Sequence, residues 1–83
     1  MKAKKGDLVT LTDGAKFIVV ETFEEDGSTA VLLSSEDGET VNYCIENMNE
    51  AGQYELYYVT EEEDIQYIAM KFDEIFKAEE ASI

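Results

Sequence analysis

The sequence predicts an α+β fold, in which a five-stranded antiparallel β-meander forms a curled sheet and one C-terminal α-helix packs on one face. Three features of the 83 residues predict it. Asp-Gly pairs recur at three positions and are a strong signal of hairpin turns. Runs of β-forming residues, each of ordinary strand length, separate these turns. After residue 60 the apolar residues follow the period of a helix instead of that of a strand.

The expected strands span residues 8–12, 16–23, 29–34, 40–46 and 53–59. The first three turns lie at Asp13-Gly14, Asp26-Gly27 and Asp37-Gly38, where glycine accepts the positive φ of a type I′ or bulged turn. A looser connection, residues 47–52, precedes the fifth strand. Because strands joined by tight turns pair with each other, the expected sheet is an antiparallel meander.

A single helix is expected after Thr60. Thr60 and Glu63 fit a capping box, in which the hydroxyl and the carboxylate each satisfy a free backbone N–H. Acids crowd the first turn, and Lys71 and Lys77 lie toward the end, as the helix dipole favours. The residues from Ala78 onward are expected to fray. The apolar positions at helical spacing are Ile65, Ile68, Ala69, Phe72, Ile75 and Phe76.

The sheet has more apolar surface than one helix can cover. A helix of about 18 residues lies across one face of a small sheet and no more. The fourth strand alternates, and we expect its side with Asn42, Cys44 and Glu46 to face solvent. The strands at 16–23 and 29–34 are apolar on both sides. They are therefore expected to be covered twice, by a sheet curling on itself or by another molecule.

Length and composition define the domain organisation and the setting. A chain this short forms one domain, expected at residues 8–80, after a basic segment at 1–7 and before a frayed end at 81–83. No run of about 18 apolar residues and no secretory signal can be recognised, so we expect a cytoplasmic protein. The single cysteine, Cys44, cannot form an internal disulfide and is expected to be a small, half-buried residue.

The charge excludes several classes of function. The chain has 20 Asp and Glu, six Lys and no Arg or His, for a formal charge of -14. Such a field repels nucleic acid and anionic membranes and attracts basic proteins. Because His is absent and a small meander has little room for an enclosed pocket, we expect no enzymatic activity. The Asp-Gly segments lack the spacing of calcium-binding loops, so no metal or other cofactor is expected.

The acids gather in clusters with two interpretations. They can form a solvated surface that also supplies turns and a helix cap. Alternatively, spaced carboxylates can imitate the phosphates of a nucleic acid and occupy a basic groove of a nucleic-acid-binding protein. The second interpretation is motivated by the lysines, since only three follow Gly6. The candidate partner-binding acids are Glu24, Glu25, Asp26, Glu36, Asp37, Glu39, Glu55, Glu61, Glu62 and Asp64.

The tyrosines all fall between residues 43 and 67. Most are expected to pack across strands and against the helix. Tyr57 is the exception, because it alternates with Tyr54, Leu56 and Tyr58. If those three face the helix, Tyr57 faces outward and is a candidate anchor for a partner.

The order of segments also carries a family resemblance. Residues 11–14, 21–27 and 30–33, followed by the acidic start of the helix at 61–64 with Phe72 and Phe76, resemble the YrzB family of small acidic bacterial proteins. The similarity covers roughly residues 8–80. It implies a bacterial cytosolic protein built around a domain of unknown function, and it supplies no catalytic residues. The loop at 47–52 and the tyrosine-rich fifth strand depart from the more uniformly acidic stretch of that family.

Two functions remain open from the sequence. The first is a non-enzymatic acidic binding module, most concretely a nucleic-acid mimic that blocks the basic groove of a nuclease or a CRISPR effector, as phage-encoded inhibitors do. The second is a YrzB-like housekeeping protein that self-associates as a homodimer through the apolar second face of its sheet.

Overall fold

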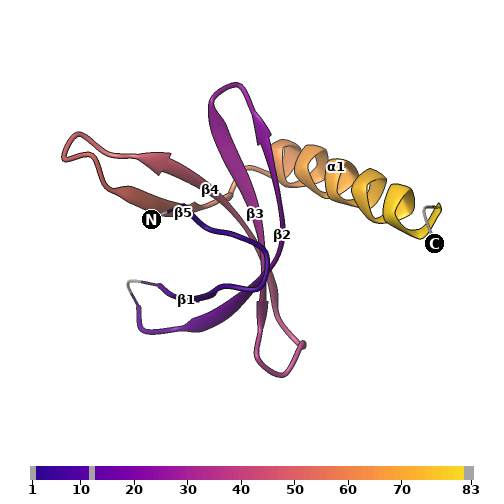
Figure 1. Ribbon diagram of the computed structural model, residues 1–83, viewed down its shortest axis with the longest axis horizontal. Helices are drawn as coiled ribbons and strands as arrows, with labels where there is room; N and C mark the ends of the chain where they lie inside the picture. Colours follow the sequence, from indigo (N-terminus) through magenta and orange to yellow (C-terminus); the bar gives the residue numbers. More distant parts are fainter. Residues whose placement is uncertain (1, 12, 82–83) are drawn as a thin grey trace.

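The computed structural model describes residues 2–11 and 13–81. Each strand pairs antiparallel with the next one in the chain, in the order β1-β2-β3-β4-β5. Figure 1 shows the sheet strongly curled, with α1 on one side of β2 and β3 and with β1 and β5 on the other. The predicted α+β meander with a C-terminal helix is therefore confirmed. The elements are β1 (Leu8–Thr10), β2 (Lys16–Glu25), β3 (Ser28–Ser35), β4 (Val41–Met48), β5 (Tyr54–Tyr58) and α1 (Glu62–Ala81).

The turn between β2 and β3 has the conformation that its sequence predicts. Glu25 pairs with Ser28, so Asp26 and Gly27 form a two-residue loop. Their φ angles are 53° and 80°, and two successive positive φ values define a type I′ turn. Its twist matches that of the flanking strands, which fixes the register of the longest hairpin in the molecule.

A β-bulge in β2 reverses which residues face which side. The pairing with β3 shifts between Val19 and Glu21, so Val20 is an extra residue. Phe17 and Val19 pack inside the curl, whereas Phe23, of the same parity in the sequence, packs on the helix side. The mixed parity of this strand is thus the result of one inserted residue.

Both faces of the central strands are buried, which confirms that they are covered twice. The second cover is the curled sheet itself together with the N-terminal segment. On the helix side, the ring of Phe72 lies edge-on to Phe23 at 4.9 Å between centroids and stacks on Tyr43 at 6.1 Å. The buried residues inside the curl are Ala3, Phe17, Val19, Val31, Leu33 and Cys44, and those on the helix side are Ala30, Leu32, Ile68 and Phe72.

The side of β4 that was expected to face solvent faces the inside of the curl. Cys44 is 1% exposed and Glu46 is 5% exposed, whereas Val41 at the start of the strand is 52% exposed. Cys44 is thus fully buried and not half-buried, and its burial raises the pKa of the thiol to about 11. The expectation was wrong because the polar residues of an alternating strand face water only if nothing covers them.

The two sides of β5 are also the reverse of the expectation, in which Tyr54, Leu56 and Tyr58 face the helix and Tyr57 faces outward. Leu56 lies opposite Glu46 and packs inside the curl, and Tyr57 lies opposite Ile45, which faces the helix side. Residues directly opposite each other share a face of the sheet, so Tyr57 shares its face with α1. Tyr57 is nevertheless 49% exposed.

Polar contacts along the N-terminal segment fasten it to the sheet. The N–H of Ala3 bonds the carboxylate of Glu46, Lys2 forms an ion pair with Glu24, and the N–H of Gly6 donates to the carbonyl of Val19 at 2.8 Å. The segment expected as a basic extension at 1–7 therefore contributes to the core.

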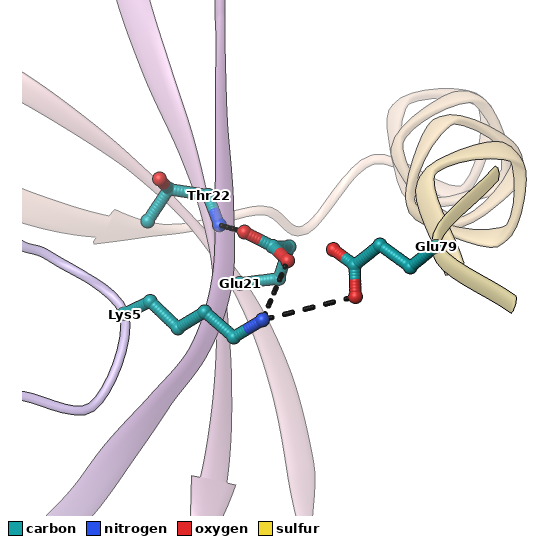
Figure 2. Close-up of polar contacts among 4 residues, drawn as sticks. All are labelled: Lys5, Glu21, Thr22 and Glu79. Atoms are coloured by element: carbon teal, nitrogen blue, oxygen red, sulfur yellow. Dashed lines mark hydrogen bonds and ion pairs between the residues drawn. The ribbon is translucent and has the colours of Figure 1, made fainter. Parts of the chain in front are cut away.

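A cluster of charges joins this segment to the end of α1. Lys5 Nζ lies 3.3 Å from Glu21 Oε2 and 3.8 Å from Glu79 Oε2, and Figure 2 shows the ammonium between the sheet and the helix. The hydrogen bond to Glu21 and the attraction of both carboxylates raise the pKa of Lys5.

The helix differs from the prediction at both ends. Its first hydrogen bond, at 3.0 Å, runs from the N–H of Ile65 to the carbonyl of Glu61, so Glu61 and not Thr60 holds the cap position. The helix continues through Ala81, beyond the expected start of fraying; residues 82 and 83 lie outside the described residues. Within residues 2–11 and 13–81, no helix is both long and apolar enough to cross a membrane.

Candidate functional site

A groove opens on the helix side of the sheet, beside the first turns of α1. It has a volume of about 460 Å³, within the range of ligand pockets. A meander of this size was expected to have little room for an enclosed pocket, and this space is an open groove. The volume arises outside the curl, where α1 packs on β2 and β4. The residues that line this helix-side groove are Phe23, Glu25, Ser28, Ala30, Ile45, Tyr57, Tyr58, Val59, Thr60, Glu61, Asp64, Tyr67 and Ile68.

The groove combines an apolar floor with an acidic rim. Phe23, Ala30, Ile45, Val59 and Ile68 supply the floor and belong to the core on the helix side. Three carboxylates lie on the rim, one at the end of β2 and two at the start of α1. All three are exposed, and none of the described residues that line the groove is a lysine.

One tyrosine ties the helix to the rim of the groove. The hydroxyl of Tyr67 donates a hydrogen bond of 2.6 Å to Glu25 Oε1. This bond is the main reason why the pKa of Tyr67 is raised, because it stabilises the protonated phenol beside a carboxylate. Tyr67 therefore holds the first half of α1 against the end of β2.

A second tyrosine lies on β5 and is held by its neighbours. The hydroxyl of Tyr57 donates to the carboxylate of Glu55, whose other oxygen accepts a hydrogen bond of 2.6 Å from the amide of Asn49. Both bonds lower the pKa of Glu55, and the bond from Tyr57 has the larger effect. The bond to Glu55 also raises the pKa of Tyr57. The ring of Tyr57 is thus exposed but oriented, as a binding anchor requires.

The groove brings together four of the predicted binding residues: Glu25, Tyr57, Glu61 and Asp64. Glu24 at the end of β2 and Asp26 in the turn between β2 and β3 lie beside it, where they line a second cleft with Glu25. Glu55 lies on β5, and Glu62 on α1 accepts a hydrogen bond from Gln66.

The acids at 36–39 lie at the other end of the sheet, in the turn between β3 and β4 (Figure 1). Asp37 Oδ1 accepts hydrogen bonds from the hydroxyl of Ser35 at 2.6 Å and from the N–H of Glu39 at 3.0 Å. The bond from Ser35, followed by that from Glu39, lowers the pKa of Asp37. Asp37 is therefore a turn-forming residue, while the side chains of Glu36 and Glu39 are exposed.

Sequence reasoning missed Tyr67 and the floor of the groove. The helical period could have indicated Tyr67. The residue does not belong to the apolar series of Ile65 and Ile68, so its ring lies at the border of the buried helix face, where its hydroxyl can reach a neighbouring strand. The floor could not be predicted, since Phe23 reaches it only after the bulge in β2. In the part of the chain that the structure describes, no three Cys, Asp or Glu side chains are grouped so that they could hold a metal ion.

The geometry defines an α+β protein with a curled meander and an acidic groove between sheet and helix. Comparison of the chain with models of protein families, with curated proteins and with solved structures gives no match. The resemblance to the YrzB family therefore stays a prediction, and the function is argued from the groove and the charge.

Proposed function

We propose that this protein is a non-enzymatic acidic binding module that takes up a basic surface of another protein in its helix-side groove. The observation that carries the proposal is the composition of the groove. Glu25, Glu61 and Asp64 surround an apolar floor, and three exposed tyrosines border it. An apolar centre with aromatic anchors and a polar rim is typical of protein–protein interfaces.

The chemistry of the groove favours lysine and arginine side chains. Such a side chain lays its aliphatic stem on an apolar surface and keeps its charged end in a polar environment. Here the stem would lie on Phe23 and Ile45, with the charge at the carboxylates of the rim. A net charge of -14 further attracts a basic surface from a distance.

The most concrete partner is a nucleic-acid-binding protein, such as a nuclease or a CRISPR effector, whose basic groove would be blocked. The acids are spread from the turn between β2 and β3 to the turn between β3 and β4, which lie at opposite ends of the sheet (Figure 1). The molecule measures 31 Å along its intermediate axis, which is the direction that separates these two turns in Figure 1, and this corresponds to about 9 steps of a DNA strand at roughly 3.4 Å per step. Spaced carboxylates over this length can replace a series of phosphates.

The test is capture from a bacterial lysate with the tagged protein, elution along a salt gradient and identification by mass spectrometry. We expect a nucleic-acid-binding protein that elutes at a few tenths molar salt and that added DNA displaces, since exposed charges are screened by salt. Recovery of proteins that DNA does not displace would contradict the mimic. Binding of the purified partner that is insensitive to salt would contradict it as well.

Matched variants locate the interface. Tyr57→Ala and the double variant Glu61→Gln/Asp64→Asn should weaken the complex at least tenfold without lowering the melting temperature. Met70→Ala, which removes an equally exposed apolar side chain on α1 outside the groove, and Glu36→Gln/Glu39→Gln, which removes the same charge at the other end of the sheet, should have smaller effects. A loss of stability in Tyr57→Ala would assign Tyr57 to the core instead.

The alternative function, self-association, was based on an exposed apolar second face of the sheet. The apolar second face of the sheet is covered by the N-terminal segment and by the curl. A homodimer that persists at high salt in sedimentation, with no other protein captured, would support the alternative and contradict the binding module.

A further inference from the structure

The two edge strands of the sheet face a common cleft. β1 and β5 each pair with only one strand, and residues of both line a space of about 590 Å³, which we call the seam. Leu8 and Val9 lie on the β1 side and Tyr54 and Leu56 on the β5 side. Leu8 is 72% exposed, so the seam presents apolar surface to solvent.

The topology of the sheet determines in which direction an added strand would run in the seam. Since all four pairings are antiparallel, β1, β3 and β5 run in the same direction. The edge strands could pair with each other only in parallel, against the alternation of the sheet. One additional strand that runs opposite to both would continue the antiparallel pattern on its two sides.

The backbone of β5 offers free hydrogen-bonding groups to such a strand. The N–H of Val59 donates to the carbonyl of Tyr43 at 2.9 Å, and that of Asn49 donates to the carbonyl of Gln53 at 2.7 Å. Hydrogen-bonded pairs alternate with non-bonded pairs along an antiparallel ladder. By that alternation, Tyr54, Leu56 and Tyr58 direct their peptide groups away from β4 and toward the open edge.

The same alternation applies to β1. The N–H of Val19 donates to the carbonyl of Asp7, and the N–H of Leu11 donates to the carbonyl of Ala15, both at 2.9 Å. The peptide groups of Leu8 and Thr10 therefore also point away from β2. Both borders of the seam thus direct N–H and C=O groups outward that pair with no other backbone group among residues 2–11 and 13–81, and a further strand can satisfy them.

The edge of β5 is short, but it has no lysine, proline or bulge. Proteins protect long edges with lysine, proline or a bulge. The strand reads Tyr-Glu-Leu-Tyr-Tyr, its pairing with β4 has no register shift, and Glu55 is its only charged residue. An edge of this kind is a template for another strand.

We propose that an extended basic segment of the protein partner adds to the sheet in the seam, antiparallel to β5 and β1. The inference rests on the proposed function and specifies how the partner binds, since Tyr57 lines both the groove and the seam. Charge selects the occupant. Asp7, Glu46 and Glu55 line the seam, and its lining, in the part of the chain that the structure describes, contains no lysine. A second copy with a charge of -14 would be repelled.

The alternation of side chains specifies the segment further. Leu56 faces the inside of the curl, while Glu55 faces the opposite side. A strand beside β5 therefore fits best when apolar residues alternate with lysine or arginine. The apolar residues would continue the core inside the curl, and the basic residues would lie beside Glu55.

The test uses a defined probe, an acetylated eight-residue peptide in which Lys and Val alternate. We expect binding that slows amide hydrogen exchange at Tyr54, Leu56 and Tyr58 at least tenfold. A peptide of the same composition with four Lys followed by four Val controls for charge. Peptides that are N-methylated at every second residue cannot donate along one edge and should bind at least tenfold more weakly.

A protein variant gives an independent measurement. Tyr54→Pro removes one edge N–H at the first residue of β5, where proline is tolerated, and Tyr54→Ala retains that N–H. Proline should weaken binding of the alternating peptide at least fivefold relative to alanine. The N-methylated peptides are tested on the wild-type protein, so they test strand addition even if Tyr54→Pro does not fold.

The outcomes separate this inference from the proposed function. If N-methylated and unmodified peptides bind equally, or if the block peptide binds as well as the alternating one, strand addition is wrong and the acidic groove is unaffected. If basic proteins bind and are displaced by DNA while the alternating peptide does not bind, strand addition is again wrong and the proposed function stands. If neither binds at low salt, both proposals fail.

Discussion

The N–H of Ala3 donates to both carboxylate oxygens of Glu46, each at 3.0 Å, across 43 residues of sequence. Glu46 is buried inside the curl, where a carboxylate without hydrogen bonds would be costly. This contact fastens the N-terminal segment to β4 and gives the buried acid a donor. It explains why a strand that looks half solvated from its sequence has an acid in the interior.

Removal of this carboxylate should destabilise the fold. In Glu46→Ala the N–H of Ala3 loses its acceptor, and we expect the free energy of unfolding to fall by about 1–3 kcal/mol. Urea denaturation measures it. Glu36→Ala, at an exposed position in a turn, is the control and should change stability by less than about 0.5 kcal/mol. Equal effects of the two substitutions would show that the contact does not contribute.

The carboxylates of Glu21 and Glu79 should make stability depend on pH. Burial acts to raise the pKa of Glu21, but hydrogen bonding with Glu79, Thr22 and Lys5 lowers it overall. Figure 2 shows the bonds from Thr22 and Lys5. The pKa of Glu79 is raised, first by hydrogen bonding to the neighbouring carboxyl of Glu21. An acid with a raised pKa stabilises the fold below its unfolded pKa, and this stabilisation is lost as the pH rises through its folded pKa.

Glu79→Gln tests this sign. The amide keeps a donor toward Glu21 and removes the like charge, so the variant should melt at a higher temperature than the wild type at pH 7. The difference should disappear as the pH is lowered to about 4, where Glu79 of the wild type is protonated. Glu80→Gln removes the same charge from the adjacent helical position and is the control. A higher melting temperature for Glu80→Gln than for Glu79→Gln would refute the assignment to this cluster.

The turn between β2 and β3 should be sensitive to its glycine. Gly27 has a φ of 80°, and an added Cβ would meet no atom within 4 Å, so only backbone strain opposes substitution. We expect Gly27→Ala to lower the free energy of unfolding by about 1 kcal/mol. Asp26→Asn is the comparison, since asparagine accepts the φ of 53° at that position, and it should be near neutral. Thermal melts of the two variants measure the difference.

Cys44 should react with thiol reagents only after unfolding. The side chain is buried, and its burial raises the pKa of the thiol to about 11, so little thiolate exists at pH 8. Labelling with a chromogenic disulfide reagent should be negligible in the native protein and complete in denaturant. Rapid labelling of the native protein would show that the curl opens on the timescale of the reaction.

Local features of the sequence determined the elements and their order. Asp26-Gly27 produced a type I′ turn because the two residues accept positive φ, and the series Ile65, Ile68, Phe72 produced a helix because its spacing matches 3.6 residues per turn. These signals depend only on neighbours in the chain. The apolar residues on both sides of β3 likewise predicted that both faces of this strand are buried, without showing which elements cover them.

Tertiary structure decided which face meets which partner. Alternation divides a strand into two sets of side chains, but it cannot show which set is covered, as Glu46 and Tyr57 demonstrate. The bulge at Val20 changed the parity of β2 without any signal from glycine or proline. The bulge places Phe23 on the floor of the groove. The curvature of the sheet brings β1 and β5 to the two sides of the seam. Long-range packing determines both, because the residues that form each site come from strands that are distant in the sequence.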